Sequence, residues 1–154
     1  MEFKDETDFS KDFFERTIYN LKLYESHNKK DKIEFKHEVV QLINSLLGLV
    51  VFVKEDGVNF SSVELSDVKL ENDIIWNYCD RNGGRFEEKN FKNFLRHIRN
   101  AIAHKRLTIK SYRQQNIRSV VFKDENKNNK FEVELSIKEI KDLIYKLSEC
   151  IGKQ

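Results

Sequence analysis

Hydrophobic residues recur three and four positions apart in four long stretches of the chain. These stretches cover residues 8–28, 32–54, 91–107 and 137–151. Residues with this spacing share one face of a helix, so each stretch predicts an amphipathic helix. A shorter apolar segment over residues 70–79 favours a fifth helix.

The second of these helices has the widest apolar surface. Its apolar positions are Val39, Leu42, Ile43, Leu46, Leu47, Val50 and Val51. One neighbouring helix cannot cover so wide a surface, so this helix either occupies the centre of a bundle or also forms a dimer interface. The apolar run spans about 15 residues, whereas a membrane span needs roughly 20, so we expect no membrane association.

Two segments near the C-terminal end, residues 118–122 and 131–135, predict the strands of a β-hairpin. In the second, Phe131, Val133 and Leu135 occupy one face and Glu132 and Glu134 the other. Residues 124–129 are expected to form the connecting loop, and the basic segment 105–116 is expected to be irregular.

The last helix opens with a capping box that runs from Ser136 to Glu139. Proline is absent and glycine occurs only 5 times, which favours helices with short connections. The sequence therefore predicts a mainly α fold: a helical bundle of four to five helices with one β-hairpin before the last helix. The 154 residues are expected to form a single domain, 1–154.

Composition excludes several classes of protein. The net charge is +2, from 28 basic and 26 acidic residues, so nucleic-acid binding requires a local basic patch. Cys79 and Cys150 stand far apart, which predicts two reduced thiols rather than a zinc site or a disulfide. The acidic N-terminus shows no secretory signal, and we expect a cytoplasmic protein. No phosphate-binding glycine loop or zinc-protease motif is present, so neither a cofactor nor a metal is expected.

The third predicted helix ends in a cluster of polar and basic residues. At about 100° per residue, one stripe of its surface is apolar and comprises Phe91, Phe94, Leu95, Ile98, Ala101 and Ile102. Arg96, His97, Asn100 and His104 are predicted to point away from that stripe, and Arg99 lies on its shoulder. The helix is therefore expected to present these side chains from a well-anchored backbone.

Arg99 and His104 suit the cleavage of RNA without a metal. RNA carries its own nucleophile, the 2′-hydroxyl, so a protein needs only to move protons and to stabilise the pentacoordinate phosphate. The pKa of histidine, about 6.5, suits proton transfer, and the arginine fork suits phosphate oxygens. Asn100 is a supporting residue that either fixes the tautomer of His104, four residues on, or holds phosphate. Both residues also have a non-catalytic interpretation. His104 is then a histidine that stabilises the helix end through the helix dipole, and Arg99 is a partner in a surface ion pair.

Four further residues around the motif are expected to extend an RNA-binding patch: Arg96, His97, Lys105 and Arg106. Each of them is alternatively a solvated charge. His97 lies seven residues before His104 on nearly the same helix face, which also makes it a candidate for a second proton-transfer group.

Residues Arg99 to His104, RNAIAH, resemble the R-N-x-x-x-H form of the motif of HEPN (higher eukaryotes and prokaryotes nucleotide-binding) domains. These are small helical proteins, and the order of the predicted elements is similar to that of short prokaryotic members. The resemblance implies a metal-independent endoribonuclease that leaves a 2′,3′-cyclic phosphate, with Arg99 and His104 as catalytic residues. It also implies a role in toxin–antitoxin or anti-phage defence systems, with an antitoxin or defence protein as partner.

Helix geometry adds an expectation about assembly. Arg99 and His104 are separated by about 140° around the helix axis and ~7.5 Å along it, so one copy does not bring both to one phosphate. Two copies related by a two-fold axis do, which predicts a homodimer with a composite site. The alternatives are a non-catalytic HEPN-like module that binds RNA, a nucleotide or a partner protein, and a plain dimeric scaffold.

Overall fold

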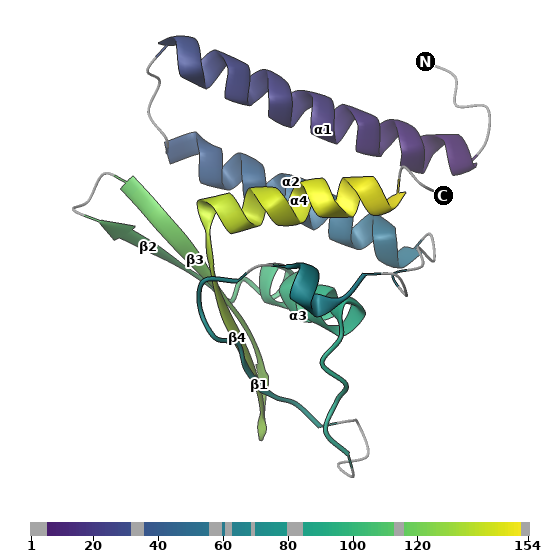
Figure 1. The fold of residues 1–154 in the computed structure, drawn as a ribbon, viewed down its shortest axis with the longest axis vertical. Coiled ribbons are helices and arrows are strands. Elements are labelled where there is room, and N and C mark those ends of the chain that lie inside the picture. Colours follow the sequence, from purple (N-terminus) through teal and green to yellow (C-terminus); the bar gives the residue numbers. More distant parts are fainter. Residues whose placement is uncertain are drawn as a thin grey trace. The chain divides into compact units, whose positions relative to one another are not determined.

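The computed structural model of the chain describes residues 6–31, 36–55, 60, 63–68, 70–79, 85–112 and 116–151 (Figure 1). The chain forms two compact units. The first combines Met1–Val58 with Lys141–Gln154, and the second covers Asn59–Ile140. That the 154 residues fold as a single domain stays a prediction.

The first unit contains α1 (Glu6–Asp31), α2 (Lys36–Glu55) and the part of α4 (Ile137–Ile151) that follows Ile140. These are the first, second and last helices that the apolar periodicity predicts. Their buried side chains repeat at helical spacing: Phe14, Leu21, Val39, Leu42, Leu46, Leu49, Val50, Leu143, Ile144 and Leu147. Val51, predicted as part of the apolar surface, is 39% exposed.

Two local features hold the helices of the first unit together. α1 packs against α2 where Gly48 leaves room for the Phe13 ring, since a Cβ at this position would lie 2.9 Å from the ring. α4 is tied to α1 through Glu25, which accepts a hydrogen bond from the Tyr145 hydroxyl (3.3 Å) and pairs with Lys141 (3.4 Å). Burial and the nearby Glu25 carboxylate raise the pKa of Tyr145.

The second unit is built on a four-stranded antiparallel sheet in the order β1-β4-β3-β2. Its strands are β1 (Ile75–Asn77), β2 (Leu107–Tyr112), β3 (Asn116–Asn126) and β4 (Asn129–Ser136). The helix α3 (Phe91–Ala103) packs against β3 and lies beside the sheet in Figure 1. A 3-10 turn, η1 (Leu65–Asp67), precedes β1.

The sheet has an apolar face and a polar face, as the predicted alternation in β4 requires. Buried residues of the apolar face are Trp76, Val120, Phe122, Phe131, Val133 and Leu135. On the polar face, Glu134 pairs with Lys110 (2.6 Å) and Glu132 pairs with Lys130 (3.2 Å). The prediction that Phe131, Val133 and Leu135 share one face is confirmed.

The predicted fold class, a mainly α bundle with a single hairpin, is wrong. Among the described residues the structure has four α-helices and a four-stranded sheet. The segment predicted as a short helix contains β1, and the segment predicted as irregular contains β2. Both are edge strands, and β1 has only three residues, so their own side-chain patterns are weak. Backbone pairing with β4 and β3 fixes their conformation.

The hairpin is also longer than predicted. β3 runs on to Asn126 and β4 begins at Asn129, so only two residues connect them. By contrast, the predicted capping box at the start of α4 is confirmed. The Glu139 carboxylate accepts from the Ser136 amide (2.6 Å), and the Ser136 hydroxyl accepts from the Glu139 amide (3.2 Å). Glu139 is buried and also accepts from the amide of Glu71 (2.6 Å).

Candidate functional site

The helix that carries the motif, α3, is fixed at both ends by local interactions. At its start, the Asn90 side chain accepts a hydrogen bond from the amide of Asn93 (2.9 Å). At its end, the amides of Lys105 and Arg106 donate to the carbonyls of Ile102 (3.0 Å) and Ala101 (2.8 Å). This is the hydrogen-bond pattern of a Schellman motif, which usually has glycine in the left-handed position. Here that position is Lys105, with φ of 56°.

The apolar stripe predicted for α3 is confirmed, because all six of its residues are buried: Phe91, Phe94, Leu95, Ile98, Ala101 and Ile102. His97, however, is not on a solvent-facing side. Although it lies off the apolar stripe, its side chain is 0% exposed, so it does not extend a solvent-facing patch for RNA as expected. The sheet and the segment before α3 cover that flank of the helix, and periodicity within the helix carries no information about them.

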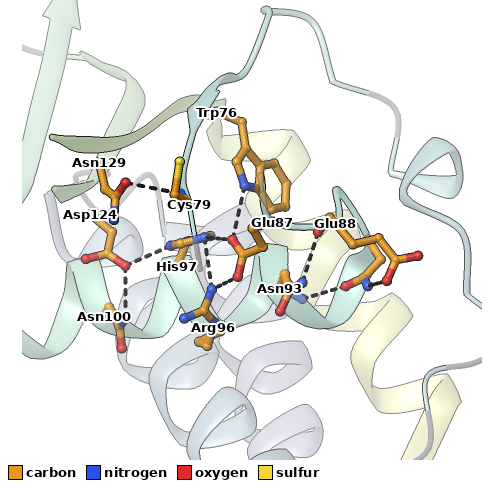
Figure 2. A network of polar contacts seen from close by, with 11 residues as sticks. Trp76, Cys79, Glu87, Glu88, Asn93, Arg96, His97, Asn100, Asp124 and Asn129 are labelled. Atoms are coloured by element: carbon orange, nitrogen blue, oxygen red, sulfur yellow. Dashed lines mark hydrogen bonds and ion pairs between the residues drawn. The ribbon is translucent and has the colours of Figure 1, made fainter. Parts of the chain in front are cut away.

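The His97 ring lies between two carboxylates (Figure 2). Its Nδ1 is 2.8 Å from Oδ2 of Asp124, on β3, and its Nε2 is 2.7 Å from Oε2 of Glu87, in the segment before α3. The ring is stacked on Phe131 with centroids 4.5 Å apart and contacts Tyr78 at 4.4 Å. The histidine thus joins three segments of the chain, and its own side chain has no exposed surface.

Glu87 has two further partners besides His97. Its Oε1 forms an ion pair with Arg96, and its Oε2 accepts a hydrogen bond from Nε1 of Trp76 (3.2 Å). Arg96 also lies over the Tyr78 ring, 5.8 Å from its centroid. In Figure 2, Arg96 and Trp76 lie beside Glu87 on one side of His97. Arg96, predicted to contact RNA, is therefore an exposed residue whose guanidinium is engaged within the protein.

Asp124 is the second centre of the network. Besides the hydrogen bond with His97, its Oδ2 accepts one from Nδ2 of Asn100 (2.9 Å), and its Oδ1 is 3.8 Å from Arg106. Burial disfavours the charged carboxylate, but the hydrogen bonds from His97 and Asn100 outweigh it and hold the pKa of Asp124 below its usual value. Asp124 is therefore ionised at neutral pH and acts only as an acceptor.

Asn100 connects Asp124 to the predicted catalytic arginine. Its Oδ1 accepts a hydrogen bond from Nη2 of Arg99 (2.9 Å), while its Nδ2 donates to Asp124. Both hydrogen-bonding ends of the amide are therefore directed at partners other than His104. Arg99 is half-buried, and its Nε is buried and has no hydrogen-bond partner in the described part of the chain.

The C-terminal end of α3 is open to solvent. His104 is the C-cap residue and is exposed, as are Lys105 and Arg106. Arg106 is partly engaged, since its Nη1 donates to the carbonyl of Glu125 (2.6 Å). The motif residues thus divide into a fixed, half-buried pair, Arg99 and Asn100, and an accessible histidine.

Two residues of this network were not identified from the sequence. Asp124 was placed in the hairpin loop, although it continues the two-residue alternation of Val120 and Phe122 onto the apolar face. That alternation is the signal that finds it. For Glu87, nothing local in the sequence indicates its pairing with a histidine ten residues later.

No group of three or more His, Cys, Asp or Glu side chains among the described residues is arranged to hold a metal ion. None of the described helices has both the length and the apolar character needed to cross a membrane. Cys79 and Cys150 are not joined in a disulfide.

The family model described as HEPN pEK499 p136 matches residues 1–154. No curated protein matches the chain. No solved structure matches it either.

Proposed function

The chain belongs to the HEPN pEK499 p136 family, and from this premise we propose that it is a metal-independent endoribonuclease. Membership of a HEPN family suggests a nucleotide-binding or ribonuclease-like role. The proposal is more specific: the 2′-hydroxyl of RNA attacks the adjacent phosphate. Arg99 binds that phosphate, and His104 transfers the protons. The products are a 2′,3′-cyclic phosphate and a 5′-hydroxyl end.

The observation that carries this proposal is the contrast between a fixed arginine and a free histidine on one helix. Asn100 holds the Arg99 guanidinium at 2.9 Å and is itself bonded to Asp124. A cation held in place before the substrate binds stabilises the charge of a phosphorane without reorganisation. His104 is exposed at the C-cap, where an imidazole is free to exchange protons with a substrate.

The proposed site is shared between two copies of the chain. Arg99 and His104 occupy different sides of α3, so the arginine of one protomer acts with the histidine of its partner across a two-fold axis. Exposed Lys105 and Arg106 extend the contact with RNA phosphates. Because His97 is buried, the proposal does not include it among the groups that touch RNA. A defence role, with an antitoxin as partner, is proposed from the family's ribonuclease character.

The test is cleavage of a structured RNA pool by the wild type and by His104→Ala, with excess EDTA throughout. We expect the wild type alone to cleave and to leave cyclic phosphate ends, with a loss of about 10²- to 10⁴-fold in the variant, as for other general acid–base groups. Equal cleavage by both proteins rejects the role of His104. RNA binding without cleavage by either protein favours the alternative function, a non-catalytic RNA-binding module.

A mixing experiment tests the composite site separately. Arg99→Ala and His104→Ala are each expected to be inactive as homodimers. A mixed dimer of the two contains one site with both wild-type residues, so re-associating the two variants is expected to restore part of the activity. A fully active monomer, or no recovery in mixed dimers of demonstrated composition, contradicts the shared site.

A further inference from the structure

The buried centre of the second unit is a chain of polar contacts that ends at Arg99. Glu87 contacts Nε2 of His97, and Nδ1 of His97 contacts Asp124. Asp124 accepts from Asn100, and Asn100 accepts from Arg99. All these contacts between side chains measure 2.7–2.9 Å. Of these five residues, only Arg99 contacts the phosphate in the proposed reaction, so the role of the other four still has to be explained.

Both nitrogens of His97 face acceptors. Asp124 is ionised, and Glu87 already accepts from Trp76 and forms an ion pair with Arg96. Nδ1 lies 2.8 Å from the Asp124 carboxylate and Nε2 lies 2.7 Å from that of Glu87, with Nη2 of Arg96 a further 3.4 Å contact of Nε2, while the His97 side chain itself is 0% exposed. Such a ring cannot turn over without losing both hydrogen bonds, and the contacts with Phe131 and Tyr78 also restrict its orientation.

The Asp124 carboxylate determines which way the Asn100 amide faces. Asp124 only accepts, so Asn100 must direct Nδ2 at it, and Oδ1 then faces the guanidinium of Arg99. Arg99 only donates, so a flipped amide places two donors together and two acceptors together. The acceptor that holds Arg99 is therefore set by Asp124, and the position of Asp124 is in turn set by His97.

We infer that His97 is a positioning residue, which acts through Asp124 and Asn100 to fix the Arg99 fork that receives an RNA phosphate. This inference deepens the proposed function and rests on it. A guanidinium that is already in position when the RNA binds lowers the barrier of the cleavage reaction. Displacing it by about 1 Å costs on the order of 100-fold in rate. His97 contacts neither the RNA nor any proton that the reaction transfers.

A matched pair of variants separates positioning from simple structural support. In His97→Asn the amide nitrogen replaces Nδ1 and keeps the donor toward Asp124. In His97→Gln it replaces Nε2 and keeps the donor toward Glu87. Each variant removes the ring and one of its two carboxylate contacts, so the loss of packing is similar. Only the first variant retains the connection that leads to Arg99.

The first readout is independent of activity and follows the Nε–H proton of Arg99 by NMR. This nitrogen is buried in the wild type, so its proton is expected to exchange slowly. We expect slow exchange to persist in His97→Asn and to be lost in His97→Gln. The same exchange rate in the two variants, or fast exchange already in the wild type, overturns the inference.

The second readout is RNA cleavage, with binding of a 2′-O-methylated RNA oligonucleotide as the measure of affinity. We expect kcat of His97→Gln to fall about 10- to 100-fold below that of His97→Asn, at equal unfolding free energies of the two variants. Equal kcat values overturn the inference. If the wild type does not cleave RNA, the proposed function fails by itself, and the exchange of the Arg99 proton still decides whether His97 positions it.

Discussion

Two histidines on one helix lie seven residues apart and have opposite surroundings. On a regular helix they differ by only about 20° in direction. His97 is fully buried between two carboxylates, whereas His104 is exposed at the C-cap of α3. The helix supplies the same geometry to both. The difference comes from what covers it: β3 and the segment before α3 contribute the carboxylates that meet His97.

This contrast shows that chemical identity and helix face do not assign a role to a histidine. A buried imidazole held by two carboxylates is suited to orient other groups, because it has no path for proton exchange with a substrate. An exposed imidazole at a helix end is suited to proton transfer. The buried residue and the exposed residue are therefore expected to fail in different ways when they are replaced.

The largest expected effect is on stability. His97→Ala leaves the Asp124 and Glu87 carboxylates without the ring that both contact, so the free energy of unfolding is expected to fall by about 3–5 kcal/mol. His104→Ala changes an exposed side chain, and we expect a change within about 0.5 kcal/mol. Urea unfolding at pH 7, followed by the fluorescence of Trp76, the only tryptophan, measures both. Equal losses in the two variants contradict the contrast between them.

A smaller loss of stability is expected when Asp124 is replaced. Asp124→Asn weakens hydrogen bonds to a charged group, so we expect a loss of about 1.5–3 kcal/mol at pH 7. Because the pKa of Asp124 is lowered by folding, its contribution is present above the unfolded value, about pH 4, and is lost as the pH falls toward the folded value. Unfolding free energies measured between pH 7 and pH 3 are therefore expected to converge for wild type and variant.

A matched control for this experiment is Glu134→Gln on the polar face of the sheet. Hydrogen bonds from Lys110 and Ser119 lower the pKa of Glu134, but this carboxylate faces solvent, so added salt screens its contribution. We expect 0.5 M salt to remove most of the effect of Glu134→Gln and little of the effect of Asp124→Asn. A similar salt response in both variants contradicts the buried character of Asp124.

The smallest effect is expected at the exposed end of α3. Lys105 has a left-handed backbone, which costs a side-chain-bearing residue about 1–2 kcal/mol. Lys105→Gly is therefore expected to raise the unfolding free energy by about 0.5–1 kcal/mol, after the entropy cost of glycine, and Lys105→Ala is not. Both variants are expected to lower the slope of log affinity for RNA against log salt by about 1. Equal stabilities of the two variants contradict this prediction.

The parts of the fold that the sequence predicted are those with local causes. The apolar stripe of α3, the capping box at Ser136 and the two faces of β4 all follow from residues within a few positions of one another. β1 and β2 were missed because edge strands depend on the partners they pair with. The site shows the same division: the exposed place of His104 at the helix end was predicted, whereas the burial of His97 was not.

By itself, the sequence determined which residues α3 carries and where along the helix Arg99, Asn100 and His104 stand. Only the tertiary structure decided their partners. Glu87 and Asp124 lie 10 and 27 residues from His97. Asp124 meets the ring because β3 packs against α3, and Glu87 meets it from the segment before α3, where its amide donates to the Tyr78 carbonyl. A hydrogen bond between side chains depends on distance in space, and helix periodicity reports only on neighbours along the chain.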